Sequence, residues 1–352
     1  MTGGERPGGA PPPLACTMGE PAGIGAELLL KAWLSSRGVG PRFFALDDPA
    51  RLEHLARRLD LAVPIAPIAA PQEADAAFDS ALPVLPVSLP IPVEPGRPDP
   101  RNAGAVLASI ERAVELVQNG AATGLVTNPI NKALLYQAGF RHPGHTEYLA
   151  ELAGLPPESA VMMLAAPELR VVPVTVHLPL KEAVARLSSA SIFHAGWVTA
   201  EALVRDFGIA RPRLAVAGLN PHAGEGGALG LEEATIIAPA LTQLREQGGD
   251  LGDLEVIGPV AADSLFHAAA RQGYDAVLCM YHDQALIPLK TLAFSHGVNV
   301  TLGLPFVRTS PDHGTAFDIA GRGIADPRSF MAALALAREM AAARARHERA
   351  LA

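Results

Sequence analysis

The sequence predicts an α/β protein with a largely parallel β-sheet, and three observations support this fold class. Short apolar runs alternate with longer amphipathic stretches, which is the pattern of successive strand–helix units. Hydrophobic residues make up 49% of the 352 residues and charged residues only 18%, so a large buried core is readily built. The apolar runs end in polar clusters, and the carboxyl ends of parallel strands meet at one edge of a sheet. These clusters are therefore expected to converge on one site.

The expected elements follow from the period of the apolar residues. Six runs are expected to form strands: residues 13–17, 124–127, 171–176, 214–219, 275–281 and 298–303. Seven amphipathic stretches are expected to form helices: residues 23–35, 103–118, 146–153, 181–188, 192–206, 231–247 and 326–348. The Gly- and Pro-rich residues 1–13 are expected to be a disordered tail, and the proline-rich residues 81–103 to be irregular. The Arg-rich end of the last helix is interpreted as a solvated face.

Composition excludes several functional classes. The net charge is -8 and no basic block occurs, which argues against binding to nucleic acid or to an anionic membrane. No run of 18 apolar residues occurs, so no membrane-spanning helix is expected. The N-terminal stretch lacks the long apolar segment of a signal peptide. The two cysteines, Cys16 and Cys279, lie in apolar runs and are expected to be buried thiols, which favours a reducing, cytoplasmic location.

Three histidines, each in the polar residues that end an expected strand, are the strongest candidates for function. They are His177, His222 and His282. Three neutral imidazoles around one divalent ion, with further positions open, are typical of a catalytic metal site. A single histidine at a strand end is more often a hydrogen-bonded structural residue. The three lie about 40–60 residues apart, so their spacing leaves a shared metal and separate structural roles as equal alternatives.

The segment GHTEYLAEL places His145 and Thr146 at the start of an expected helix. Thr146 is a natural N-terminal capping residue, which is the structural interpretation. The same geometry, with imidazole and hydroxyl groups beside a helix N-terminus, also suits a phosphate or a carboxylate. The Gly-rich segment 19–27 matches neither the P-loop nor the G-x-G-x-x-G dinucleotide fingerprint, so no cofactor-binding residues are assigned.

Charged and polar side chains near other strand ends complete the candidate site. Lys290, Asn299 and Arg308 suit an anionic substrate, and the alternative for the two cations is a pair of surface charges. Asp263 is nominated for a proton relay, with a helix cap as its alternative role. Lys132, one of only four lysines among 28 basic residues, is a second candidate for the relay.

Eight sequence blocks together resemble the 4-hydroxythreonine-4-phosphate dehydrogenase family, and they span residues 14 to about 340. They are TMGEPAGIGAE, LVTNPINKALL, GHTEYLAEL, VHLPL, GLNPHAGEGGALGLEE, GPVAADSLF, MYHDQALIPLK and GVNVTLGLPFVRTSPDHGTAFDIAGRG. The resemblance implies that the three histidines bind a metal. It implies substrate contacts at His145, Thr146, Lys290, Asn299 and Arg308. Glu20 and Ala26 depart from the Asp and Pro of many relatives, and neither change removes a ligand.

The resemblance also implies a fold of the isocitrate/isopropylmalate dehydrogenase type, with two α/β lobes around a central cleft. The first lobe is expected to comprise residues 14–150 and about 300–352. The second lobe, about residues 151–299, is expected to hold the metal ligands and the dimer contacts. A homodimer is implied in which each metal site takes His177 from one subunit, and His222 and His282 from the other.

The implied reaction is the oxidation of 4-phosphohydroxy-L-threonine by NAD or NADP to 2-amino-3-oxo-4-phosphooxybutanoate. This β-keto acid decarboxylates to 3-amino-2-oxopropyl phosphate, a step in the synthesis of pyridoxal 5'-phosphate (vitamin B6). One zinc, magnesium or cobalt ion per site would lower the pKa of the substrate hydroxyl. Three alternatives stay open: a dehydrogenase of a related phosphorylated sugar acid such as threonate 4-phosphate, a three-histidine metal hydrolase, and a non-catalytic phosphoacid-binding protein.

Overall fold

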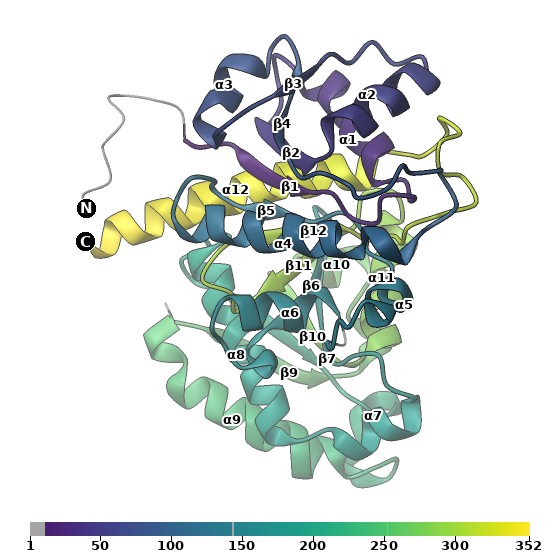
Figure 1. Cartoon of the computed structure of the whole chain (residues 1–352). Helices are drawn as coiled ribbons and strands as arrows, with labels where there is room; N and C mark the ends of the chain where they lie inside the picture. Colours follow the sequence, from purple (N-terminus) through teal and green to yellow (C-terminus); the bar gives the residue numbers. More distant parts are fainter. Residues whose placement is uncertain (1–10, 143, 252) are drawn as a thin grey trace. The chain divides into compact units, whose positions relative to one another are not determined.

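The computed structural model describes residues 11–142, 144–251 and 253–352, and the chain divides into two compact units (Figure 1). The first unit runs to Arg141 and also includes His313–Pro327. The second unit comprises His142–Asp312 and Arg328–Ala352. The C-terminal residues from 328 onward therefore group with the second unit, whereas the expected lobe boundaries assigned them to the first. Residues 1–10 of the expected tail lie outside the described part of the chain.

The first unit is built on parallel strands in the order β3-β4-β2-β1-β5. The strands are β1 (Leu14–Thr17), β2 (Phe43–Asp47), β3 (Ile65–Pro67), β4 (Leu82–Pro86) and β5 (Leu125–Val126). The helices are α1 (Gly25–Ser36), α2 (Pro49–Arg58), α3 (Ala74–Ala77), α4 (Ala103–Gln118) and α5 (Lys132–Gln137). Every residue of β1 and β2 is buried, which explains why these strands are apolar at nearly every position.

The second unit is built on a mixed sheet in the order β12-β11-β6-β7-β10-β8-β9. The strands are β6 (Val161–Ala166), β7 (Leu169–Thr175), β8 (Arg213–Ala217), β9 (Glu255–Val260), β10 (Ala276–Tyr281), β11 (Val298–Leu302) and β12 (Arg308–Pro311). The α-helices are α6 (His145–Leu152), α7 (Leu180–Arg186), α8 (Ser189–Arg205), α9 (Ala238–Gln247), α10 (Ala268–Arg271), α11 (His282–Ala293) and α12 (Arg328–Leu351). The strands β7, β10, β8 and β9 are parallel, whereas β6, β11 and β12 pair in antiparallel fashion.

The core of the second unit lies beneath β7, β8 and β10. Val171, Ala215 and Val277 are fully buried, one from each strand, and pack in one cluster with Leu289 of α11. A closely packed layer of this kind holds the strand ends rigidly. Residues placed at those ends therefore have fixed positions, which is what a catalytic or binding site requires.

All six expected strands are observed, as β1, β5, β7, β8, β10 and β11. The seven expected helices are also observed, as α1, α4, α6, α7, α8, α9 and α12. Six have boundaries shifted by at most three residues, and α9 begins seven residues later than expected, after a π-helix over Glu233–Ile237. The prediction of a largely parallel sheet holds for the first unit. It is wrong for part of the second unit, because the hairpin of β6 and β7 and the strands β11 and β12 introduce antiparallel pairs.

The proline-rich segment 81–103 was expected to be irregular, but it begins with strand β4. The main-chain nitrogen of Pro83 faces β2, but the pairing of β2 with β4 starts only at the next residue, Val84. The main-chain nitrogen of Pro86 faces β3, but the pairing of β3 with β4 has already ended at Val84. Because neither proline lies where the ladder needs its missing N–H, the strand tolerates both.

Helix α11 was missed by the sequence analysis, since Pro288 stands inside it. The helix forms because Ala285, Leu286 and Leu289 are buried against the sheet, which offsets the lost backbone hydrogen bond. His282 consequently opens a helix rather than a turn. Lys290 lies in the last turn of the same helix rather than at a strand end.

Helix α12, yellow in Figure 1, packs on β11, β12 and α8, which explains its place in the second unit. Its Arg-rich end is not wholly solvated, because Arg344 is buried and donates to Asp206 at 2.7 and 2.9 Å. Cys16 and Cys279 are both buried free thiols, as expected. Among the described helices none is long and apolar enough to span a membrane.

Candidate metal and substrate site

Two of the three candidate histidines lie side by side at the ends of paired strands. His177 follows β7 by two residues and His282 follows β10 directly. These strands are parallel neighbours, with Thr175 opposite Tyr281, so they end level with each other. The two imidazole rings consequently lie with centroids 5.7 Å apart and planes inclined by 43°.

This pair of rings has the spacing of two ligands on one ion. Two imidazoles bound to zinc at about 2.0–2.1 Å have ring centroids roughly 5 Å apart, close to the spacing observed. The Nδ1 atom of His282 lies 2.7 Å from Oδ1 of Asp283, which fixes the ring and leaves its Nε2 atom for a ligand. Histidine ligands commonly have such a carboxylate partner. The donor set therefore fits a divalent metal.

His222 lies on the loop after β8, the strand on the other side of β10. Five consecutive residues of this loop, from His222 to Gly226, have φ between 44° and 78°. His177 also has a left-handed φ of 49°. Such values are costly for residues other than glycine, and they occur preferentially at functional sites. Within the described residues of a single chain, no group of three or more His, Cys, Asp or Glu side chains is assembled for metal binding.

The two candidates for proton relay belong to different units of the structure. Asp263 lies on a short 3-10 helix, Ala262–Ser264, which contacts the His222 loop, and its carboxylate is exposed. Lys132 is the exposed first residue of α5 in the first unit. Asp263 is therefore the candidate that shares a unit with the histidines.

His145 and Thr146 are the first two residues of α6, as expected, but Thr146 does not cap the helix. The N-cap position is taken by Gly144, which has no side chain to bond the first-turn amides. Both side chains are half-buried in the first helical turn. A helix that begins without a side-chain cap retains N–H groups that can donate to an anion.

Asn299, Thr301 and Arg308 form one polar cluster on the neighbouring strands β11 and β12. The Arg308 side chain donates from Nη1 to Thr301 Oγ1 at 2.8 Å and to Asn299 Oδ1 at 3.4 Å. Only 3% of Arg308 is exposed, and this burial lowers the pKa of its guanidinium to about 10. A guanidinium in such surroundings is strongly stabilised by an anionic ligand.

Lys290 is only partly available as a free cation, because its Nζ lies 3.2 Å from Asp312 Oδ2. It lines a cavity of about 420 Å³ together with His282 and Asp283. A second cavity of about 210 Å³ is lined by His177, His282 and Asp283. The second unit therefore has two hollows that share His282 and Asp283 in their linings, one beside the paired imidazoles and one beside the Lys290 ammonium.

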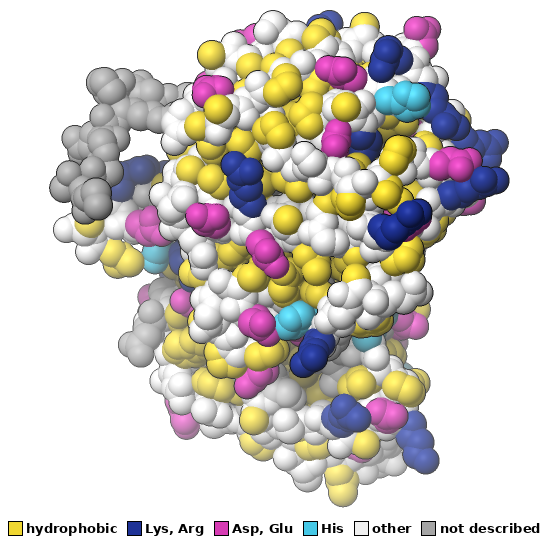
Figure 2. Space-filling view, viewed as in Figure 1, with side chains coloured by type: hydrophobic (Ala, Val, Ile, Leu, Met, Phe, Trp, Pro, Cys, Tyr) yellow, Lys and Arg dark blue, Asp and Glu magenta, His cyan; other side chains and the backbone are white. Residues whose placement is uncertain are grey.

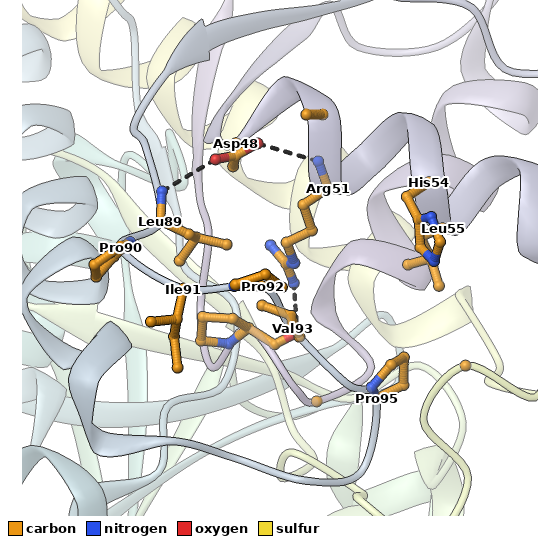
Figure 3. A pocket seen from close by; sticks show the side chains of 14 residues that line it. Asp48, Arg51, His54, Leu55, Leu89, Pro90, Ile91, Pro92, Val93 and Pro95 are labelled. Carbon is orange, nitrogen blue, oxygen red and sulfur yellow. Dashed lines mark hydrogen bonds between the residues drawn. The ribbon is translucent and has the colours of Figure 1, made fainter.

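The first unit has a separate, mostly apolar cavity of about 390 Å³. Figure 3 shows its wall of Leu89, Pro90, Ile91, Pro92 and Val93 facing Arg51 and His54 of α2. Asp48 holds this wall by accepting from the Leu89 amide at 3.0 Å, and Arg51 Nη2 donates to the Pro21 carbonyl at 2.8 Å. The cavity lies beyond the carboxyl ends of β1, β2 and β4, where α/β proteins bind nucleotides and cofactors.

Sequence reasoning missed two site residues that the structure reveals, the buried side chains of Glu233 and Gln284. Asp283, which contacts His282, belongs to the motif YHDQ that the sequence analysis quoted. Gln284 is the next residue of that motif, and Glu233 is the last residue of the block GLNPHAGEGGALGLEE, but neither block indicates which buried groups these side chains bind.

Charged side chains of both signs lie on the face of the molecule that Figure 2 draws. On the face drawn in Figure 2, basic and acidic side chains of the described residues are interspersed among apolar ones.

The fold and the strand-end site define the class: an α/β protein whose polar residues gather where the strands of its sheet end, the region in which such proteins bind ligands. Comparison with known proteins narrows this class. The sequence model of a family described as "Pyridoxal phosphate biosynthetic protein PdxA" matches residues 41–337. The chain therefore belongs to the PdxA family.

Relatives and solved structures agree with this assignment. A 4-hydroxythreonine-4-phosphate dehydrogenase of Bradyrhizobium diazoefficiens is 54% identical over 344 residues, covering 94% of this chain and 98% of its own. The enzyme of the same name from Caulobacter vibrioides is 54% identical over 336 residues, with the same coverage. A crystal structure of that enzyme from Klebsiella pneumoniae has 37% identity and a TM-score of 0.83, covering 94% of this chain and 99% of its own. The predicted family and the α/β fold class are thus confirmed.

The tight loop of His222 yields a stability prediction. At Gly226, with φ 66°, an added Cβ meets nothing within 4 Å, so Gly226→Ala adds only backbone strain of about 1–2 kcal/mol. At Gly224, with φ 78°, an added Cβ would lie 2.6 Å from Glu233 Oε2, so overpacking should cost about 1–3 kcal/mol more. Urea-unfolding midpoints of the two variants measure the difference. Equal midpoints would show that Glu233 does not confine this loop.

Proposed function

We propose that the protein oxidises 4-phosphohydroxy-L-threonine, with NAD or NADP as the hydride acceptor, in the synthesis of pyridoxal 5'-phosphate. The observation that supports this function is 54% identity, over nearly the whole chain, to relatives that have this enzyme name. The product is 2-amino-3-oxo-4-phosphooxybutanoate, a β-keto acid that decarboxylates to 3-amino-2-oxopropyl phosphate. A dehydrogenase of threonate 4-phosphate remains the second candidate, because the same cations would suit that phosphorylated acid.

His177, His222 and His282 are the proposed ligands of a divalent metal ion. When bound, such an ion lowers the pKa of an alcohol that coordinates it. The Asp283 contact to His282 supports this assignment, and the 5.7 Å spacing of the His177 and His282 rings would suit an ion held within one chain, the alternative that subunit mixing tests. Imidazole ligands favour zinc or cobalt over magnesium. Asp263, exposed beside the His222 loop, is the proposed acceptor of the alcohol proton, with Lys132 as the alternative.

The substrate's anionic groups are proposed to bind at Arg308, Asn299 and Lys290, and at His145 and Thr146 at the start of α6. Burial of Arg308 supports the first of these, because a buried guanidinium binds phosphate or carboxylate with little competition from water. Asn299 and Thr301 orient the guanidinium plane. Lys290 would exchange its contact with Asp312 for a substrate oxygen.

The dinucleotide is proposed to place part of its length in the apolar cavity of the first unit. This cavity offers apolar walls for a planar ring, and the imidazole of His54 and the guanidinium of Arg51 for polar groups. Its volume of about 390 Å³ lies within the range of small-molecule sites. Its position at the carboxyl ends of parallel strands supports the assignment.

The working enzyme is proposed to be a cytoplasmic homodimer with metal sites shared between subunits. Large apolar side chains are exposed around the histidines, which supports a second chain covering this surface. Leu180 is 60% exposed and lines the cavity of His177, and Ile287 is 63% exposed and lines the cavity of Lys290. Leu229 and Leu231, 44% and 61% exposed, follow the His222 loop. The two buried free cysteines support a reducing location.

The function is tested by NADH or NADPH formation with 4-phosphohydroxythreonine and phosphothreonate assayed side by side. We expect absorbance to rise with 4-phosphohydroxythreonine, with kcat/KM at least about tenfold above that for phosphothreonate, because a site built for one polar group rejects the analogue lacking it. A faster reaction with phosphothreonate would select the second candidate. Phosphate release without reduction of the dinucleotide would select a hydrolase.

If the substrate binds at Arg308 and the dinucleotide binds in the first-unit cavity, substitutions at the two sites should each raise a different Michaelis constant. Arg308→Lys, which loses the bidentate fork, should raise the substrate KM about 10–100-fold and leave the NAD KM unchanged. Ile91→Trp, which fills the first-unit cavity, should raise the NAD KM by a similar factor and leave the substrate KM unchanged. Val39→Trp, at a residue 92% exposed, is the control for the added indole. Reversed effects would exchange the two assignments.

Subunit mixing distinguishes a metal site shared between subunits from a site built within one chain. The proximity of His177 and His282 in one chain favours the second of these arrangements. His177→Ala and His222→Ala proteins should each be inactive. If sites are shared, a heterodimer has one site lacking two ligands and one intact site, so about half the activity per heterodimer returns. If each site lies within one chain, every site keeps one defect. A proven heterodimer without activity would exclude the shared arrangement.

A further inference from the structure

Between the end of β8 and His222 lies a short stretch of chain, Gly218–Asn220, to which two buried polar side chains are hydrogen-bonded. One is Glu233, at the start of the π-helix Glu233–Ile237, and the other is Gln284, in the first turn of α11. We propose that Glu233 and Gln284 are positioning residues that fix His222 relative to His282 and so set the metal affinity of the site. This inference rests on the proposed metal-dependent function.

The Glu233 carboxylate accepts hydrogen bonds from the backbone amides that precede the His222 loop. Its Oε1 atom accepts from the amides of Leu219 and Asn220 at 2.8 and 2.7 Å. Its Oε2 atom accepts from Nδ2 of Asn220 at 2.9 Å, and Nδ2 also donates to Glu232 at 2.8 Å. Glu233 is only 6% exposed, so water competes little for the groups that form these hydrogen bonds. Removing the carboxylate would leave buried N–H groups without an acceptor.

Gln284 connects the same stretch to the helix of His282. Its Nε2 atom donates to the Gly218 carbonyl at 2.8 Å, and its Oε1 atom accepts from the Met280 amide at 2.7 Å. Both atoms are used, and the residue is buried. Gln284 lies two residues after His282 on α11. One amide group therefore ties the β8 end to β10 and to the helix that presents His282.

The loop needs such anchors because its backbone does not favour this shape by itself. His222, Ala223 and Glu225 all have left-handed φ values, of 52°, 51° and 44°. The chain also folds back so closely that a Cβ added at Gly218 would lie 3.0 Å from Ala223. Strained backbone persists only where its surroundings over-determine it. Glu233 and Gln284 supply the hydrogen bonds that do so at the entry to the loop.

Isosteric variants test the proposal on the full-length protein. Glu233→Gln replaces one acceptor oxygen by a donor, and Gln284→Met keeps the length but removes both hydrogen bonds. Glu246→Gln and Gln243→Met, at exposed residues of α9, are the matched controls. The zinc affinity of each protein is measured by competition with a chromophoric chelator. Thermal midpoints and amide hydrogen exchange over residues 218–226 are measured on the same samples.

Both positioning variants should bind zinc about 10–100-fold more weakly than the parent, with faster amide exchange over residues 218–226. Excess zinc should restore NADH formation in them, which a merely structural role would not produce. Controls should match the parent in all three measurements. If a variant fails to fold, the other variant decides. Parental zinc affinity in a folded variant overturns this inference and leaves the proposed function standing. No zinc binding by the parent and the controls overturns both.

Discussion

The site depends on one constraint, the parallel pairing of β10 with β7 on one side and β8 on the other. Because parallel strands in register end at the same edge of a sheet, the residues after Thr175 and Tyr281 leave the sheet together, and β8, whose Val216 pairs with Leu278, ends at the same edge. His177 and His282 thereby reach a ring spacing of 5.7 Å although they are far apart in the sequence. A shift of one residue in this pairing would turn the strand ends to the opposite face and separate the rings.

Rigid strand ends alone do not direct the histidines, since two of them lie on strained backbone. His177 and His222 both have left-handed φ values, which the chain adopts only where neighbouring groups hold it. Around His222 that support comes from buried polar bonds rather than apolar packing. The Glu233 carboxylate accepts two main-chain amides, and the Gln284 amide bridges Gly218 and Met280. A buried network of this kind is stable when each member is satisfied, and it specifies one geometry.

The cationic side chains of the second unit differ in how deeply they are buried and in which groups they contact. Arg308 is buried, and desolvation lowers the pKa of its guanidinium to about 10, so it gains most from an anionic ligand. Lys290 is more exposed and shares its charge with Asp312, so it suits an exchangeable contact. Arg344 is also buried, yet it is fully engaged by Asp206 and serves the packing of α12. Burial of an arginine in this unit therefore accompanies both a packing role, at Arg344, and the proposed anion-binding role of Arg308.

The sequence by itself determined six of the twelve strands and seven of the twelve α-helices of the described residues, the family and the residues of interest, because these depend on local periodicity and on contiguous motifs. It missed the strands β2, β3, β4, β6, β9 and β12 and the helices α2, α3, α5, α10 and α11. In β4 and α11, Pro83, Pro86 and Pro288 gave local signals that tertiary packing overrode. It also missed Glu233, whose role depends on the backbone amides of residues 219 and 220 brought to it by folding. Only the tertiary structure decided that His177 and His282 are neighbours, that Lys290 belongs to a helix, and that Arg308 is buried. The physical reason is that distance and burial arise from strand register and from contacts between distant segments, which no local pattern encodes.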